Sequence, residues 1–242
     1  MQDPRIFLTF DPDYVSVQEN AGEAGAMPFA LNFYHDQIGA DGSSAAALLP
    51  ARRLLYVRHG RVVINGQAMS ADQAIYCDGP LALQSAGEWS QVWRWELGSP
   101  DAAPALHQGK AVLSSLRMSR VITSIGMVEG SRWIFRLDQI IHGGEQVADR
   151  HQHPGPGIRC LIEGTFNVQQ AAESHRNLMP GDPWWETGSD TVVAWGSKQM
   201  PARFLRGMVL PVEWEGKVTG TWLSGGPPPG HWKLFFDQVI AV

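Results

Sequence analysis

The chain has 242 residues, of which 44% are hydrophobic and 18% charged, and its formal net charge is −5. This length fits one large all-β domain or two small ones, and the composition is that of a globular protein. No run of Lys or Arg exceeds a pair, and no stretch approaches the roughly 18 apolar residues of a membrane span, so we expect neither nucleic acid nor membrane as a partner. The start lacks the features of a secretory signal, and Cys77 and Cys160 are too few for a disulfide framework. We therefore expect a cytoplasmic protein with reduced thiols.

Short strands separated by Gly, Asp and Pro clusters, together with ten tryptophans, favour an all-β architecture. In chain order, the pattern predicts strands at residues 54–57, 61–64, 91–97, 133–140, 159–162, 165–169, 191–195, 203–210 and 231–242.

Two stretches of the chain share a weak internal repeat. Each has a strand that ends near a glycine, then a hairpin, then a turn that ends in an aspartate. The glycines are Gly60 and Gly164, and the aspartates are Asp72 and Asp182. Two copies of one β unit are the economical account of this repeat.

The best linker between the copies is the Gly-, Ser- and Pro-rich stretch 98–104. We therefore predict an N-terminal barrel at residues 1–104 and a C-terminal barrel at residues 105–242. The C-terminal barrel carries the expected site. In the N-terminal barrel the equivalent stretch, 48–53, holds no His or Glu, so this half is expected to be a scaffold without a metal.

The most informative chemistry is the pair His151 and His153. On a strand, residues i and i+2 point to the same face, so the two imidazoles can converge on one ion. The following Pro-Gly-Pro-Gly stretch, 154–157, predicts a tight reversal before a new strand and turn.

The string HQHPGPGIRCLIEGTFNV, residues 151–168, resembles the first motif of the cupin superfamily, in which a His-x-His precedes a loop, a strand and a glycine. The string PGDPWWETG, residues 180–188, is similar to the second motif. The resemblance implies two cupin barrels, double-stranded β-helices of the jelly-roll type, with the site in the mouth of the second.

Cupin metal sites commonly add a Glu four residues after the second His, where this chain has Gly157, and a further His that is absent from residues 187–193. The gentisate-type dioxygenases of the same superfamily dispense with the Glu and hold ferrous iron with three histidines. The residues that match their motif are His151, His153, Ile158, Arg159, Leu161, Ile162, Glu163 and Gly164. In that branch the arginine faces the substrate carboxylate, although the third histidine is missing here as well.

Glu186 or Asp190 could complete the ligand set, and we favour Glu186. With His151 and His153 it makes a two-histidine, one-carboxylate set, suited to one divalent ion of Fe, Mn, Zn or Ni. If the strand is extended, Trp184 shares the face of Glu186 and could wall a pocket.

We expect two arginines to bind the substrate. Of Arg203 and Arg206, only one can face the interior, because they are three residues apart on a strand, and we select Arg206. If Gly157 faces inward, Arg159 does too, and the missing Glu side chain leaves room for its guanidinium. An Arg159 that faces inward needs a partner, either Glu186 or a bound carboxylate. The sequence leaves both hypotheses open.

The first function hypothesis is a metal-dependent cupin that acts on a small organic acid, with a non-haem dioxygenase as the favoured version. The alternatives are a non-catalytic cupin that binds a small metabolite, and a metal-free isomerase or hydrolase. We also expect an anionic small-molecule ligand and a homodimer, because unpaired sheet edges favour association.

Overall fold

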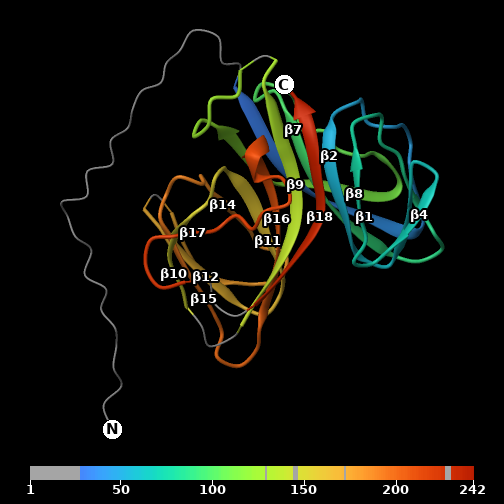
Figure 1. Cartoon of the computed structure of the whole chain (residues 1–242). Coiled ribbons are helices and arrows are strands. Elements are labelled where there is room, and N and C mark those ends of the chain that lie inside the picture. The colour runs from blue at the N-terminus through green and yellow to red at the C-terminus, as the bar shows by residue number, and fades with distance from the viewer. Residues whose placement is uncertain (1–27, 129, 144–146, 172, 227–229) are drawn as a thin grey trace.

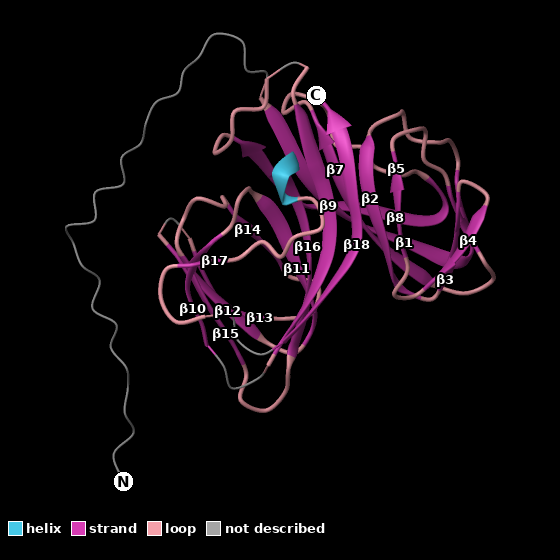
Figure 2. Cartoon of the chain, viewed as in Figure 1, coloured by secondary structure: helices cyan, strands magenta, loops and turns pink. Residues whose placement is uncertain are grey.

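A computed structural model describes residues 28–242 except 129, 144–146, 172 and 227–229. Within these residues the chain forms antiparallel strands joined by turns, with one short 3-10 helix, η1 (Val212–Trp214) (Figure 2). The expected all-β class is therefore confirmed. In the same part of the chain, no helix has the length and apolar character that a membrane crossing requires.

The first half is an eight-stranded sheet that curls on itself (Figure 1). Its order is β4-β3-β6-β1-β7-β2-β5, and β8 pairs with the other edge of β1. Inside the curl lies an apolar cluster that includes Ile38, Leu55, Val57, Val62 and Val92. The strands are β1 (Phe29–Ser44), β2 (Arg52–His59), β3 (Arg61–Ile64), β4 (Gln67–Ser70), β5 (Ala74–Cys77), β6 (Leu83–Ser85), β7 (Ser90–Gly98) and β8 (Gly109–Ile122).

The second half is a barrel of two five-stranded sheets, ordered β13-β12-β15-β10-β17 and β14-β11-β16-β9-β18. A second apolar cluster, including Leu161, Phe166, Trp184 and Phe204, lies between them. The strands are β9 (Arg132–His142), β10 (Val147–Gln152), β11 (Gly157–Glu163), β12 (Phe166–Gln170), β13 (Ser174–Leu178), β14 (Pro183–Glu186), β15 (Val192–Gly196), β16 (Ala202–Pro211), β17 (Thr221–Trp222) and β18 (Gly230–Ala241).

All nine strands predicted from the sequence are present, and β3 has the predicted ends. The longest strand, β1, was not predicted, and neither was β8. Since β8 pairs with β1 along almost its whole length, the first-half sheet extends through Ile122. The boundary expected near residue 104 stays a prediction about domains, but it does not coincide with the end of this sheet.

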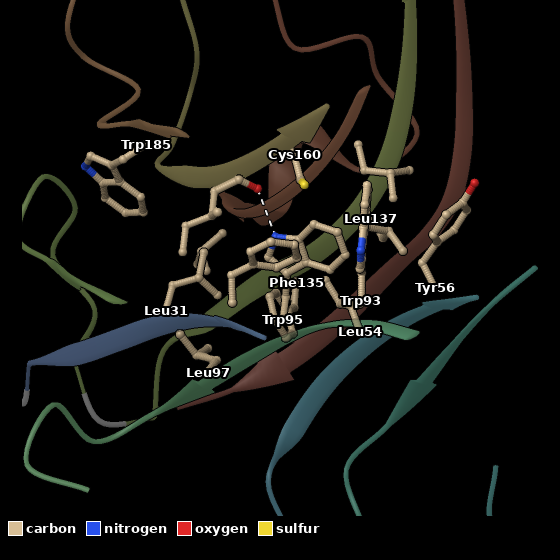
Figure 3. Packing of buried hydrophobic residues seen from close by; sticks show 14 of the residues in the cluster. Leu31, Leu54, Tyr56, Trp93, Trp95, Leu97, Phe135, Leu137, Cys160 and Trp185 are labelled. Atoms are coloured by element: carbon tan, nitrogen blue, oxygen red, sulfur yellow. Dashed lines mark hydrogen bonds between the residues drawn. The ribbon is translucent and has the colours of Figure 1, made fainter. Parts of the chain in front are cut away.

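The two halves pack against each other through a large apolar cluster (Figure 3). Strands β2 and β7 contribute Leu54, Tyr56, Trp93, Trp95 and Leu97, and the second half contributes residues of β9, β11, β16 and β18. The indole Nε1 of Trp95 donates a hydrogen bond of 2.9 Å to the carbonyl oxygen of Ile158 in β11. A side chain in one half is thus tied to the backbone of the other.

Alternation along the strands explains this arrangement, because successive residues of a strand point to opposite faces. In β11, Ile158, Cys160 and Ile162 pack in the cluster between the halves, while Leu161 packs inside the second barrel. The same alternation places Arg159 inside that barrel. Strands buried on both faces read as nearly continuous apolar runs, which is why their sequences were easy to recognise.

The internal repeat corresponds to a repeated local geometry. Gly60 and Gly164 both have positive φ, 71° and 83°, and both lie against the backbone of another segment. In the first half the amide of Asp72 donates to the carbonyl oxygen of Val57, and in the second the amide of Gly181 donates to that of Leu161. A side chain at either glycine would meet both steric and conformational resistance.

The interior of the first half holds a chain of paired charges. Arg94 contacts Asp36 at 2.8 Å and Glu96 at 2.9 Å, and Arg53 contacts Glu96 at 2.6 Å. His107, which is 3% exposed, lies beside this chain with its Nδ1 3.0 Å from Ser44 Oγ. Burial lowers the pKa of His107 to about 4, so its imidazole is neutral in the folded protein at neutral pH.

Gly207 tests the packing between the halves, because a Cβ there would overlap the ring of Trp95. We expect Gly207→Ala to lower the free energy of unfolding by about 1–3 kcal/mol through overpacking. Urea unfolding measures the change. Gly98→Ala is the matched control, because a Cβ on this strand glycine meets nothing within 4 Å. Equal stabilities of the two variants would contradict the packing described here.

His107 gives a pH prediction. The pKa of His107 is about 4 in the folded protein and about 6.5 in the unfolded chain. Between about pH 4 and pH 6.5 the unfolded chain therefore binds more protons than the folded protein. Stability should therefore fall as the pH drops from about 6.5 to about 4. We expect His107→Gln to reduce this loss by about 1–3 kcal/mol in urea titrations at pH 7 and pH 4.5. The exposed His231→Gln should keep the wild-type pH dependence, and identical curves for all three proteins would refute the assignment.

Candidate functional site

The two histidines of the predicted site lie side by side in the second barrel. His151 is in β10, and His153 follows this strand by one residue. Their ring centroids are 5.0 Å apart, with the rings nearly perpendicular. Trp222 of β17 stacks on His151 at 4.6 Å, and both histidine side chains are almost fully buried. The His-x-His spacing therefore brings the imidazoles together, as expected.

Hydrogen bonds fix the tautomer of both rings. The Nδ1 atom lies 2.7 Å from the carbonyl oxygen of Asp149 in His151, and 2.5 Å from that of Thr219 in His153. A carbonyl oxygen only accepts, so each Nδ1 carries the proton and donates it. In the neutral ring, Nε2 then has a free lone pair. Metal-bound histidines use this arrangement, in which an outer partner orients the ring.

Burial keeps both rings neutral. It lowers the pKa of His151 to about 4, and the neighbouring His153 acts in the same direction. Burial also lowers the pKa of His153, although the contact with Glu186 opposes this shift. Neutral imidazoles are the form that binds a metal ion.

Glu186 lies against His153 and Arg159. Its Oε2 atom is 3.2 Å from Nε2 of His153 and 2.9 Å from Nη2 of Arg159, while Oε1 accepts a 2.8 Å hydrogen bond from Nε1 of Trp184. Trp184 and Glu186 therefore lie on the same face of β14, as predicted. Burial alone would raise the pKa of Glu186, but Arg159 and His153 outweigh it and hold the pKa well below its usual range.

The Oε2 atom of Glu186 is close to two nitrogens, yet no N–H in the described part of the chain is directed at it in hydrogen-bond geometry. Arg159 supplies positive charge to this oxygen at 2.9 Å, but the oxygen accepts no well-directed hydrogen bond from the described residues. It would be satisfied by a cation placed between it and its neighbours.

Arg159 is completely buried and faces the barrel interior, as expected. Its Nη1 atom donates to the carbonyl oxygens of Gly157, at 2.6 Å, and Glu186, at 3.3 Å. Together with the contact to the Glu186 side chain, these bonds make Arg159 an orienting partner of that carboxylate. A substrate carboxylate would have to compete with Glu186 for it.

One expectation about Gly157 is wrong. The missing cupin Glu does not leave room beside the histidines, because a Cβ on Gly157 would lie 2.5 Å from the carbonyl oxygen of Gly207 and 2.6 Å from Cγ of Met208. Strand β16 occupies this space. The guanidinium of Arg159 therefore lies in the interior because of strand alternation, and it does not fill a vacated side-chain position.

Arg206 also faces the interior, whereas Arg203 pairs near the surface with Glu163 and Asp72. The guanidinium of Arg206 forms two bonds of 2.7 Å to the carboxylate of Asp138, which also accepts a 2.9 Å bond from Nε1 of Trp232. The predicted orientation is confirmed, and the role of Arg206 in substrate binding stays a prediction. Its charge is already matched within the barrel.

Sequence reasoning missed Asp138, Thr219 and Trp222. A signal for Asp138 exists, because β9 reads as an apolar run interrupted by charged residues at 136 and 138, which share one face. No comparable signal marks Thr219, whose carbonyl holds His153. Asp190, the alternative ligand, lies in a turn where its amide donates to Oγ1 of Thr187.

The donor atoms of this site meet only part of the needs of a metal ion. His151 and His153 meet this part, because each offers a free Nε2 and has its Nδ1 fixed by a carbonyl. Across the described residues, however, no group of three or more His, Cys, Asp or Glu side chains is arranged to hold an ion. Glu186 supplies the right donor type and contacts His153, but it is shared with Arg159.

No known protein-family model matches the sequence, and no curated protein matches it either. Solved structures do resemble the fold. AerE from Microcystis aeruginosa is 13% identical, with 74% of this chain and 88% of that chain covered and a TM-score of 0.53. A mutant salicylate 1,2-dioxygenase from Pseudoaminobacter salicylatoxidans is 12% identical, with 89% and 77% covered and a TM-score of 0.48. Vicilin from Corylus avellana is 12% identical, with 75% and 74% covered and a TM-score of 0.45.

At these identities the likeness concerns the fold alone. The antiparallel sheets described above show an all-β chain, and the likeness to AerE, with a TM-score of 0.53, is a likeness of this fold. The all-β class is therefore confirmed, whereas membership of the cupin superfamily stays a prediction from the two sequence motifs. The chemistry of the site is not transferred from these proteins.

The Arg159–Glu186 contact predicts a large stability effect. Arg159→Met removes the charge that balances buried Glu186, so we expect a loss of about 3–5 kcal/mol in urea unfolding. Adding Glu186→Gln to this variant should restore part of the loss, because no unpaired carboxylate remains. Arg203→Met, which breaks a more exposed pair, should cost less than about 1 kcal/mol. An Arg159→Met variant no less stable than Arg203→Met would exclude the structural role of the pair.

Proposed function

We propose that the second barrel binds one divalent metal ion through His151, His153 and Glu186 and acts on a small organic acid. The observation that carries this proposal is the 3.2 Å approach of His153 Nε2 to Glu186 Oε2. Because His153 donates through Nδ1 to Thr219, its neutral ring would turn a lone pair toward a carboxylate. A cation shared by these two atoms removes the repulsion.

Two cations could fill this role, a metal ion or a proton on Nε2. The metal accounts for more of the arrangement, because His151 offers a second, equally oriented Nε2 beside the first. It also accounts for Oε2 of Glu186, which accepts no well-directed hydrogen bond from the described residues. Two histidines and one carboxylate suit Fe, Mn, Zn or Ni with positions left open for a substrate.

In this proposal each neighbouring residue has a positioning task. Trp184 and Arg159 hold the two oxygens of Glu186, and the carbonyls of Asp149 and Thr219 hold the rings. When bound, the metal would supply Lewis-acid or redox chemistry, with oxygen chemistry as the favoured version. The organic acid is proposed because two arginines, Arg159 and Arg206, face the interior, where an anion could compete with their present partners.

A second candidate is a barrel without metal, either a non-catalytic metabolite binder or an acid–base enzyme. It is favoured by the mutual pairing of the interior charges, Arg159 with Glu186 and Arg206 with Asp138. In that case the 3.2 Å contact between His153 and Glu186 would share a proton. Metal content separates this candidate from the first.

We expect the untagged protein, purified with added divalent metal, to hold about one equivalent of ion by elemental analysis, because the paired imidazoles are prearranged. His151→Ala and His153→Ala should each lose it. His175→Ala is the control. His175 is on β13, where it contacts Glu173 at 3.3 Å and not the two site histidines, so this variant should retain full metal occupancy.

Metal content far below one equivalent in the wild type would favour the metal-free barrel. Full occupancy in the His151→Ala, His153→Ala double variant would place the ion elsewhere. Either result would overturn the proposed centre.

A further inference from the structure

A second site lies at the seam between the two halves, separate from the histidine pair. It is a cavity of about 380 Å³. Strands β1, β2, β7 and β8 of the first half form most of its wall, and the turn at 180–182 of the second half closes one side. Its volume is in the range of cavities that bind small molecules.

Two residues that line the cavity, Trp93 and His35, each carry a buried ring nitrogen without a partner among the described residues. Trp93 is 1% exposed and His35 is 8% exposed, and their rings stack with centroids 5.3 Å apart. Neither Nε1 of Trp93 nor Nε2 of His35 has a hydrogen-bond partner in the part of the chain that the structure describes. An indole N–H can only donate, so this position calls for an acceptor. Leaving such a donor unpaired is costly, and a ligand oxygen would satisfy it.

The charge of the cavity also favours an anion. Arg58 and Arg117 both line it, and the only carboxylate among its lining residues is that of Asp182. Oδ2 of Asp182 already accepts a 2.8 Å bond from the amide of Met179. Arg58 donates to the carbonyl oxygen of Ile162 at 3.1 Å. Arg117 lies exposed on β8 and forms no ion pair with any described residue, so its guanidinium is available to a ligand.

Two aromatic rings that line the cavity pack together. Trp89, 47% exposed, packs beside His59 with ring centroids 4.9 Å apart. A large exposed indole at the mouth of a cavity offers a stacking surface for a planar ring. The cavity thus combines arginines and an unpaired N–H with a flat apolar face.

We propose that this cavity binds a small planar aromatic carboxylate. Its carboxylate accepts from the guanidinium of Arg117 and from the N–H of Trp93, with Arg58 adding positive charge. Its ring lies against Trp89. Arginine and a carboxylate are matched in geometry, and the aromatic wall adds the preference for a flat ligand.

Isothermal titration calorimetry with 2-naphthoate tests the proposal, with cyclohexanecarboxylate and inorganic phosphate as comparison ligands. We expect 2-naphthoate to bind the wild type and the other two to bind at least about tenfold more weakly, because neither is planar and aromatic. Arg117→Gln and Trp93→Phe should each weaken 2-naphthoate binding roughly five- to tenfold. Arg61→Gln, an exposed arginine of β3 outside the cavity, is the matched control and should bind as the wild type does.

The outcomes separate this site from the metal centre. The His151→Ala, His153→Ala double variant should bind 2-naphthoate with wild-type affinity, and loss of binding there would place the ligand in the second barrel and overturn the proposal. Binding that Arg117→Gln and Trp93→Phe leave unchanged would also overturn it, as would equal affinity for phosphate. Because Arg117 is exposed, its variant keeps the test valid if Trp93→Phe is too unstable to measure.

Discussion

The first-half sheet and the β14-β11-β16-β9-β18 sheet of the second half bury their facing sides against each other. Strands β2 and β7 meet β9, β11, β16 and β18 through a cluster centred on Trp95, whose ring occupies the space that a side chain at Gly207 would take. These strands must therefore be apolar on the face toward the partner half. Whatever polar groups they carry are directed by alternation into the barrels.

Both interiors contain buried arginines that are paired with carboxylates. Each holds buried arginines, and each balances them with carboxylates from neighbouring strands: Asp36 and Glu96 in the first half, Asp138 and Glu186 in the second. Buried charges persist only when they are paired in this way. The second interior differs by adding two neutral imidazoles, one of which turns Nε2 toward Glu186, and this is why the chemistry is proposed there.

Much of this could be predicted from the sequence, and the failures have physical causes. Strands buried on both faces were found because their apolar runs are continuous. The sequence did not predict β1, because its apolar pattern is interrupted by buried His35 and Asp36 and by the stretch 39–42. It did not predict β8, because most residues of that strand are polar or exposed. Within the site, the spacing rules placed His151 beside His153 and Trp184 beside Glu186, since these relations lie within one strand or its end.

Contacts between side chains on different strands could not be predicted from spacing along the sequence. The pairing of Arg206 with Asp138 depends on the register of β16 against β9, which the sequence does not state. Because each half buries part of its apolar surface against the other, we do not expect either copy of the sequence repeat to be stable as a separate fragment. Separated, each would present the broad indole- and leucine-rich face of Figure 3 to water, and it would associate with itself.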